Sequence, residues 1–214
     1  QSWSVLSGEG EDQRSTQAMD AVMKHLVDEE TGIIRLFTPP FKRSPQNPGY
    51  IKAYPPGVRE NGGQYTHAAT WVVLALAKMG RNDDAWKCFS LLNPVNHALD
   101  RQASETYRVE PYVVTADVYG EDAYAGRGGW SWYTGSAGWL YRAAVEGILG
   151  ITRINGTLHI APSLPETWDG FSARITIKGK VREVSVKRTA GSPDVEVSLD
   201  GKPLTGKDRA IPFD

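Results

Sequence analysis

Apolar residues recur at helical spacing in four stretches of the first 150 residues. Within residues 13–27, Met19, Val22 and Leu26 lie three or four positions apart, which is typical of one buried helix face. Broader apolar faces predict three further helices, over residues 66–79, 83–92 and 136–149. Asn82 directly precedes the third helix, so we expect its side chain to cap the first turn.

Beyond residue 150 the pattern changes to an alternation of apolar and polar residues, which is typical of half-buried strands. This alternation predicts four strands, over residues 157–161, 173–178, 182–188 and 195–199. We expect Ile175 and Ile177 to share one face, and Val184 and Val186 to share another, across a turn at residues 178–180.

The dipeptide Asp200-Gly201 is a strong signal for a two-residue hairpin. A helix-rich half followed by a small antiparallel β-structure, without βαβ alternation, predicts an α+β protein. We therefore divide the chain into two parts, residues 1–150 and residues 151–214.

Charge and cysteine content narrow the function classes. Lys and Arg number 24 against 25 Asp and Glu, so no basic surface for nucleic acid and no polybasic membrane anchor is indicated. No apolar run approaches the roughly 18 residues of a membrane span, and no signal peptide is recognised. The lone Cys88 excludes an internal disulfide and is expected in the core of a cytoplasmic protein. Because the chain begins at Gln1, we expect it to belong to a longer polypeptide.

Aromatic residues are concentrated before residue 150, where most of the 7 Trp and 9 Tyr lie. Flat apolar rings beside glycine-rich backbone are typical of pyranose sites, although aromatics more often fill a helical core. Residues 33–65 and 108–135 show little periodicity. Segments this long inside a compact domain are usually functional or disordered, and the aromatic content of these two argues against disorder.

The first candidate cluster is residues 54–67, with the sequence YPPGVRENGGQYTH. Its paired glycines allow the backbone to approach a ligand closely. A helix begins next, and its free N–H groups and dipole favour an anion beside His67 in the first turn. Arg59 and Glu60 add one charge of each sign. An ordinary turn with Thr66 as cap and a surface histidine fits equally well.

The second candidate cluster is residues 126–139, with the sequence GRGGWSWYTGSAGW. Thr134 and Ser136 are candidate N-cap residues whose hydroxyls could also contact a phosphate oxygen. Gly135 allows close backbone approach, and Arg127 could supply positive charge. The alternative is a helix cap packed under aromatic rings.

Several carboxylates accompany these clusters: Glu60, Glu105, Glu110, Asp117, Glu121 and Asp122. Cleavage of a glycosidic bond with inversion needs one carboxylic acid and a nucleophile on the opposite face of the sugar. If phosphate is that nucleophile, a cradle of cations and N–H groups replaces the general base. No spacing identifies the acid. The histidines are scattered and the single cysteine adds no ligand, so no metal site is predicted.

Four segments resemble glycoside hydrolase family 94, namely residues 1–8 (QSWSVLSG), 54–67, 110–114 (EPYVV) and 132–139 (WYTGSAGW). Residues 147–151 and 158–165 also look similar to it. The family includes cellobiose, chitobiose and β-1,2-oligoglucan phosphorylases and the C-terminal region of cyclic β-1,2-glucan synthases. The resemblance covers most of the chain.

The resemblance implies an (α/α)₆ barrel, of which residues 1–150 would be the C-terminal portion, followed by an antiparallel β domain in residues 151–214. It implies reversible phosphorolysis of a β-glucoside with inversion, releasing α-glucose 1-phosphate. Inorganic phosphate would be the co-substrate, with no cofactor. About four helices cannot close a ring of six pairs, so we expect further sequence upstream.

The resemblance also assigns residues to the site by their positions in the motifs. His67, Thr134 and Gly135 would bind phosphate, whereas Tyr54 and Glu60 would line the acceptor-side sugar site.

Residues 111–120, PYVVTADVYG, look most like the β-1,2-glucan branch of the family. That resemblance implies a β-1,2-glucan as substrate. Cellobiose phosphorylases carry a Gln near Ala116 that this chain lacks, so cellobiose is not the expected substrate. The family's general acid is an Asp in an upstream segment similar to DWND, which does not occur here. We therefore expect no catalytic residue in this chain and no phosphorolysis by it alone.

The expected partners are a β-glucan oligosaccharide, phosphate, and the remainder of the chain or a second copy, which would cover exposed helix faces. If the parent is a cyclic glucan synthase, we expect it at the cytoplasmic side of the inner membrane. Two other interpretations stay open: a noncatalytic carbohydrate-binding module, and part of an (α/α)₆-barrel glycoside hydrolase. Such a hydrolase would need a catalytic base where we expect the phosphate ligands.

Overall fold

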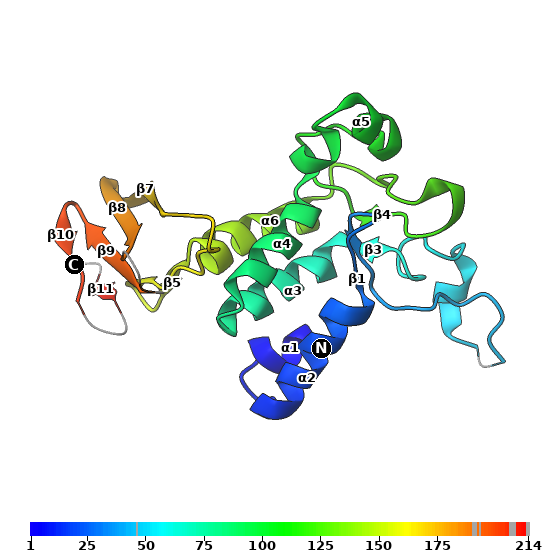
Figure 1. Ribbon diagram of the computed structural model, residues 1–214, viewed down its shortest axis with the longest axis horizontal. Helices are drawn as coiled ribbons and strands as arrows, with labels where there is room; N and C mark the ends of the chain where they lie inside the picture. The colour runs from blue at the N-terminus through cyan, green and yellow to red at the C-terminus, as the bar shows by residue number, and fades with distance from the viewer. Residues whose placement is uncertain (46, 190–191, 193, 206–208, 213–214) are drawn as a thin grey trace.

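The computed structural model describes residues 1–45, 47–189, 192, 194–205 and 209–212, with helices in the first part of the chain and most strands in the last (Figure 1). The α-helices are α1 Ser2–Leu6, α2 Asp12–His25, α3 Thr66–Lys78, α4 Asn82–Leu92, α5 Arg101–Tyr107 and α6 Thr134–Arg142. Shorter helical segments are the 3₁₀ turns η1 Gly49–Ala53, η2 Pro94–Ala98 and η3 Asp122–Tyr124 and the π-helical η4 Ala143–Ile148. The predicted α+β composition is confirmed.

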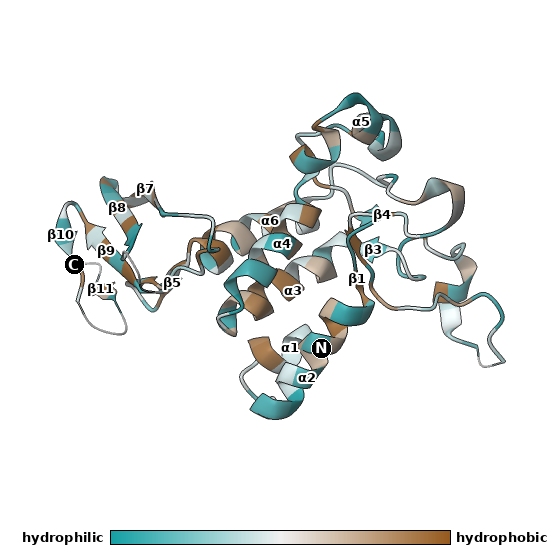
Figure 2. Cartoon of the chain, in the orientation of Figure 1, coloured by the Kyte–Doolittle hydropathy of each residue, from teal (hydrophilic) through white to brown (hydrophobic). Residues whose placement is uncertain are grey.

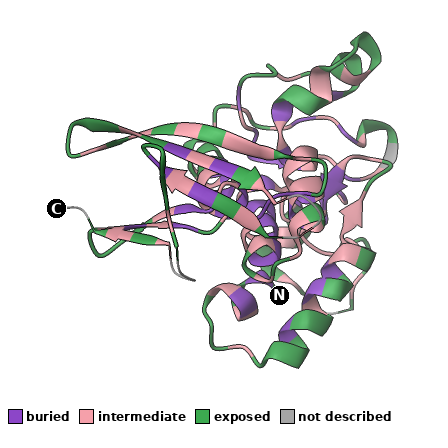
Figure 3. Ribbon diagram, turned by 60° about the vertical axis from the view of Figure 1, so that its left-hand side comes forward, coloured by how far each residue is buried: buried purple, intermediate pink, exposed green. Residues whose placement is uncertain are grey.

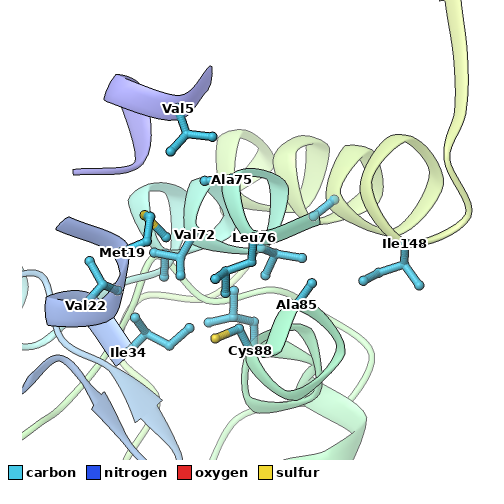
Figure 4. Close-up of a cluster of buried hydrophobic side chains, with 14 of the residues drawn as sticks. Val5, Met19, Val22, Ile34, Val72, Ala75, Leu76, Ala85, Cys88 and Ile148 are labelled. Atoms are coloured by element: carbon cyan, nitrogen blue, oxygen red, sulfur yellow. The ribbon is translucent and has the colours of Figure 1, made fainter. Parts of the chain in front are cut away.

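Helix α3 lies at the centre of the helical core. Its residues Val73, Ala75 and Leu76 are completely buried, among side chains from α1, α2, α4 and η4 (Figure 4). Hydrophobic residues accordingly concentrate in the central helices, whereas α5 is largely hydrophilic (Figure 2). The helix predicted over residues 66–79 is confirmed, and its broad apolar face reflects contact on several sides.

A short turn joins α3 to α4. Gly80 adopts a φ of +73°, and its N–H donates to the Ala77 carbonyl while the Arg81 N–H donates to the Leu76 carbonyl. This paired return is a Schellman motif, which ends a helix by satisfying its last carbonyls.

Asn82 does not cap α4, so that prediction is wrong. The helix begins at Asn82 itself, after Arg81, and has no side-chain capping hydrogen bond. Asn82 Oδ1 instead accepts a hydrogen bond from the Ser163 hydroxyl at 2.6 Å, and Asp83 Oδ1 accepts one from the Glu166 N–H at 2.8 Å. The start of α4 thus binds a segment 81 residues away in the sequence, which no local pattern could indicate.

The helices predicted over residues 13–27 and 136–149 correspond to α2 and to α6 continued by η4. Helices α1 and α5 were not predicted, because five and seven residues are too few for a periodic pattern. Asp100 caps α5 by accepting a hydrogen bond from the Ala103 N–H. Within the described ranges, no helix is both long and apolar enough to cross a membrane.

Two short antiparallel strand pairs structure the long segments between the helices. Strand β1 Val27–Asp28 pairs with β2 Ile33–Ile34, and β3 Gln64–Tyr65 pairs with β4 Asp117–Val118. The second pairing joins the two predicted functional loops, since Tyr65 lies opposite Asp117.

The C-terminal part contains two antiparallel sheets. The strands are β5 Ile151–Ile154, β6 Thr157–Ile160, β7 Gly170–Ile177, β8 Lys180–Arg188, β9 Val195–Leu199, β10 Lys202–Pro203 and β11 Ala210–Pro212. Their order is β11-β6-β5 in one sheet and β10-β9-β8-β7 in the other. Buried residues of β8 and β9 line a second core, as the purple stretches of Figure 3 show. All four predicted strands are confirmed as β6 to β9, with ends that differ by at most three residues, and β5, β10 and β11 were missed.

The expectation that Ile175 and Ile177 lie on a different face from Val184 and Val186 is wrong. The turn between β7 and β8 has two residues, so Ile177 lies opposite Lys180 and Ala173 lies opposite Val184. Directly opposed residues share a face, and side chains along a strand alternate. All four residues therefore point to the same side of the sheet.

Candidate functional site

The loop of residues 54–67 is held by buried amide side chains. The Asn61 amide donates to the carbonyl oxygens of Phe41 and Tyr54 and accepts from the Phe41 N–H. Gln64 accepts from the Ile34 N–H through its side-chain oxygen. Both amide residues are buried, so the loop is rigid where it enters α3.

His67 occupies the first turn of α3, as predicted. The helix follows an extended Tyr65, and the Thr66 N–H donates to the Ala116 carbonyl at 2.9 Å. No side chain caps this helix start. Thr66 is inside the helix, so it is not the capping residue of the alternative interpretation.

The start of α6 differs from the prediction in one respect. Tyr133 occupies the N-cap position without a side-chain hydrogen bond, so Thr134 and Ser136 lie inside the first turn and neither is a cap. The extended conformation of Tyr133 places the helix start two residues earlier than expected. Thr134 is exposed, whereas the buried Ser136 hydroxyl has no hydrogen-bond partner among the described residues.

The two helix starts lie side by side. A methyl group built on Gly135 would stand 3.4 Å from His67 Nδ1, so the Gly135 backbone and the imidazole are near neighbours. The His67 ring also contacts Trp71 and Trp139, at centroid distances of 5.2 Å and 5.8 Å. Both helices begin at the loop end of the helical layer, and α6 runs from there toward the β-sheets (Figure 1).

Partial burial among these rings lowers the pKa of His67 below its ordinary value, because desolvation disfavours the imidazolium. The ring is therefore neutral at pH 7 and can donate one N–H to a ligand. An anion in contact with the ring would favour the protonated form and raise this pKa again.

A second group of polar residues surrounds Arg59. Its guanidinium lies 5.6 Å from the centroid of the Tyr54 ring and 5.4 Å from that of Trp130. Its Nε is 3.7 Å from Glu60 Oε2, too long for a hydrogen bond. Both of these atoms are buried without a hydrogen-bond partner among the described residues. Such orphaned groups are typical of a site that a ligand completes.

Asp117 lies behind Arg59 and is almost completely buried. Burial raises the pKa of its carboxyl group, while a hydrogen bond from the Trp130 N–H and the charge of Arg59 act in the opposite direction. Gly129 packs against this carboxylate so closely that any side chain there would clash with it. Sequence reasoning placed Asp117 only among several carboxylates.

The side chains of Tyr65 and Tyr133 interact between the two loops at the bases of α3 and α6. Burial and this interaction raise the pKa of Tyr65. Sequence reasoning missed both tyrosines, although each directly precedes a helix in the structure.

Other candidates lie apart from this site. Arg127 stacks over Tyr124, and Glu121 pairs with Lys42. Glu105 forms an exposed pair with Arg101. Glu110 is exposed, and the side chain of Asp122 lies outside the described part. Among the described residues, no group of three or more His, Cys, Asp or Glu side chains is arranged to hold a metal ion.

The sequence matches two family models. Residues 1–150 match the model of the glycosyl hydrolase 94 superfamily, catalytic domain, and residues 152–205 match that of the glycosyl hydrolase family 65, C-terminal domain.

Three relatives illustrate the range of sequence identity. The cyclic beta-(1,2)-glucan synthase NdvB of Rhizobium meliloti is 62% identical over 200 residues, which cover 94% of this chain and 7% of that protein. The N,N'-diacetylchitobiose phosphorylase of Vibrio furnissii is 34% identical, over 87% of this chain and 23% of its own length. The 1,2-beta-oligoglucan phosphorylase of Listeria innocua is 28% identical, over 81% and 17% respectively. The chain thus spans less than a quarter of each of these relatives, and it belongs to the glycosyl hydrolase 94 superfamily.

Proposed function

We propose that this chain is the C-terminal part of an inverting β-glucoside phosphorylase, with residues 1–150 forming the end of an (α/α)₆ barrel and residues 151–214 a C-terminal β domain. Its substrate is a β-1,2-glucan, and inorganic phosphate is the co-substrate without any further cofactor. One observation carries the proposal: His67 and Gly135, from the starts of two different helices, are near neighbours.

Two converging helix starts favour an anion. The first amide N–H groups of each helix have no partner within the helix, and both dipoles place partial positive charge at this end. His67 adds a ring N–H and Thr134 adds an exposed hydroxyl. Gly135 has no side chain, which leaves its backbone open to a phosphate oxygen. We assign phosphate binding to these three residues.

In the proposed reaction, a phosphate oxygen attacks the anomeric carbon of the terminal glucose on the face opposite the glycosidic bond. The carbon–oxygen bond to the rest of the glucan breaks, and the departing oxygen takes a proton from a carboxylic acid. We place that acid, an Asp, outside residues 1–214. The products are α-glucose 1-phosphate and a shortened glucan. Phosphate is already an anion and needs no general base.

Tyr54 and Glu60 line the acceptor-side sugar in this proposal. The buried Glu60 Oε2 lacks a hydrogen-bond donor among the described residues, and a sugar hydroxyl would supply one. The Tyr54 ring is held against the Arg59 guanidinium, so its orientation is fixed before the sugar binds.

The β-1,2 linkage is supported by the names of two relatives, a cyclic β-1,2-glucan synthase and a 1,2-β-oligoglucan phosphorylase. We propose accordingly that the parent protein trims or lengthens β-1,2-glucan chains, in the cytoplasm or at the cytoplasmic side of the inner membrane.

The test is the kinetics of glucose 1-phosphate release by the full-length protein carrying His67→Ala or Thr134→Val. Each change removes one hydrogen bond to a charged ligand, which is worth about 1.5–3 kcal/mol. We expect the KM for phosphate to rise by at least about tenfold in each variant, with a smaller change in the KM for glucan.

Matched controls are His25→Ala and Thr16→Val, which alter exposed residues of α2. An unchanged phosphate KM in both site variants would contradict the proposal. Release of free glucose without phosphate would support the (α/α)₆-barrel hydrolase instead, and glucan binding without any cleavage would support the binding module.

A further inference from the structure

Two large aromatic side chains lie exposed next to each other in the segment of residues 108–135. Tyr112 is 75% exposed and Trp132 is 67% exposed. Their ring centroids are 6.2 Å apart and their planes meet at 72°. Paired rings in water leave a large apolar surface uncovered, and such a surface marks a binding site more often than a single exposed ring does.

The backbone around this pair is held in place. Trp132 adopts a φ of +60°, which a bulky residue rarely takes and which the surroundings must enforce. The Tyr133 N–H donates to the Val114 carbonyl, and the Ala116 N–H donates to the Trp130 carbonyl. The segments that carry the two rings are therefore bonded to each other. Backbone outliers of this kind cluster at ligand contacts.

The pair lies close to the proposed active site along the chain. Trp132 precedes Thr134 by two residues, so their Cα atoms lie within about 7 Å of each other. Trp130, on the same segment, is 64% exposed and lies 5.4 Å from the Arg59 guanidinium, which also contacts Tyr54. The segment that carries Trp132 thus also carries Trp130, and Arg59 joins Trp130 to the acceptor-side residue Tyr54.

We infer that Tyr112 and Trp132 form a second glucan-binding platform, which holds glucose units of a long β-glucan beyond the two that flank the cleaved bond. The inference rests on the proposed function and adds chain-length selection to it. Pyranose rings present apolar C–H faces that stack on aromatic rings, while the tyrosine O–H and indole N–H can bond sugar hydroxyls. Because the two ring planes meet at 72°, one sugar unit could stack on one ring and contact the other with its edge.

The experiment compares short and long substrates in the full-length protein. Trp132→Ala and Tyr112→Ala are assayed for phosphate-dependent cleavage of linear β-1,2-glucans with two and with about six glucose units. Loss of one stacked ring is expected to raise the KM for the longer glucan about tenfold. The KM for the disaccharide and both kcat values should stay within about twofold of the unaltered protein, because the platform lies outside the reacting sugars.

Three further variants separate the ring from the backbone. Trp132→Gly removes the ring and relieves the left-handed backbone, so it should lose long-chain affinity as Trp132→Ala does. Trp132→Phe keeps a flat apolar ring and should retain most of the affinity. Tyr124→Ala removes another exposed ring, 59% exposed and stacked on Arg127, and should leave both substrates unaffected.

The platform would be overturned if the KM rose equally for both glucans, or if the KM for the longer glucan did not change. The proposed function would still stand in either case, provided that cleavage depended on phosphate. Misfolding of the full-length protein with Trp132→Ala or with Tyr112→Ala would also overturn the platform, because it would show that the rest of the chain covers these rings. Cleavage by the unaltered protein that is independent of phosphate would overturn the proposed function itself.

Discussion

At the scale of single residues, the packing of His67 determines its protonation state. Its ring contacts Trp71 and Trp139, and this partial burial lowers its pKa. The free site therefore holds a neutral imidazole at pH 7. Binding of an anion beside the ring would raise the pKa, and thermodynamic linkage then requires that anion affinity depend on pH.

We predict that the full-length protein binds sulfate more tightly as the pH falls. Sulfate does not titrate between pH 5 and 8, so the change reports on the protein. Affinity should be constant above the His67 pKa of the complex, and should rise by up to about tenfold per pH unit below it, since one proton is taken up. It should level off below the lowered pKa of the free site. Isothermal titration calorimetry at several pH values measures this.

The slope should vanish in His67→Gln, which cannot take up the proton. Thr134→Val should weaken sulfate binding at every pH yet keep the slope. A slope that persisted without His67 would assign the proton to another group.

Some residues of the candidate site could be predicted from the sequence and others could not. His67, Thr134 and Gly135 could be singled out because each stands at a glycine-rich entry to a helix, and Cys88 is buried as expected, with its thiol pKa raised to about 12 by burial. Asp117 was one carboxylate among several, since only the fold shows that it is buried behind Arg59.

At the scale of elements, the proposed phosphate site lets a single change at the start of α6 test helix stability and ligand binding together. Gly135 lies in the first turn of this helix and its φ is not left-handed, so alanine fits the backbone. The added methyl would make ordinary contacts, the nearest being 3.4 Å from His67 Nδ1. In the proposed site, the same methyl would occupy the space where a phosphate oxygen meets the His67 ring.

Gly135→Ala should therefore stabilise the protein while impairing it. We expect the free energy of unfolding to rise by up to about 1 kcal/mol, the difference in helix propensity. The KM for phosphate should rise at least about tenfold, because a charge-assisted hydrogen bond is lost. Urea unfolding and phosphate-dependent kinetics of the full-length protein measure the two effects.

Gly138→Ala is the matched control, because a methyl there meets open space on the same helix. It should give a similar gain in stability with an unchanged phosphate KM. An unaltered phosphate KM in Gly135→Ala would show that phosphate does not lie against this residue.

The longer helices and strands could be predicted because their patterns are local. The central helices and the four strands have clear periods, and the Lys178-Gly179 and Asp200-Gly201 turns have the positive φ angles that two-residue hairpins need. The predicted capping role of Asn82 was wrong for a different reason. The Asn82 side chain is bound by the distant Ser163, a tertiary contact that overrides the local preference.

At the scale of the whole molecule, the helical and the β parts have separate cores that meet near Gly150. Gly150 adopts a φ of +64°, and a side chain there would clash with the Ala161 carbonyl, so the passage between the parts requires glycine. The family matches follow the same division, with one ending at residue 150 and the other starting at residue 152. Sequence pattern could predict this change of period, whereas the pairing of β3 with β4 that joins the two site loops depends on residues 52 positions apart.

The most direct test of the account is a structure of the full-length protein with bound phosphate. We predict one phosphate between the two helix starts, with oxygens about 2.7–3.2 Å from a His67 ring nitrogen and from the Gly135 N–H, and with the Thr134 hydroxyl in contact. Phosphate bound elsewhere, or held by only one of the two helix starts, would contradict the central claim.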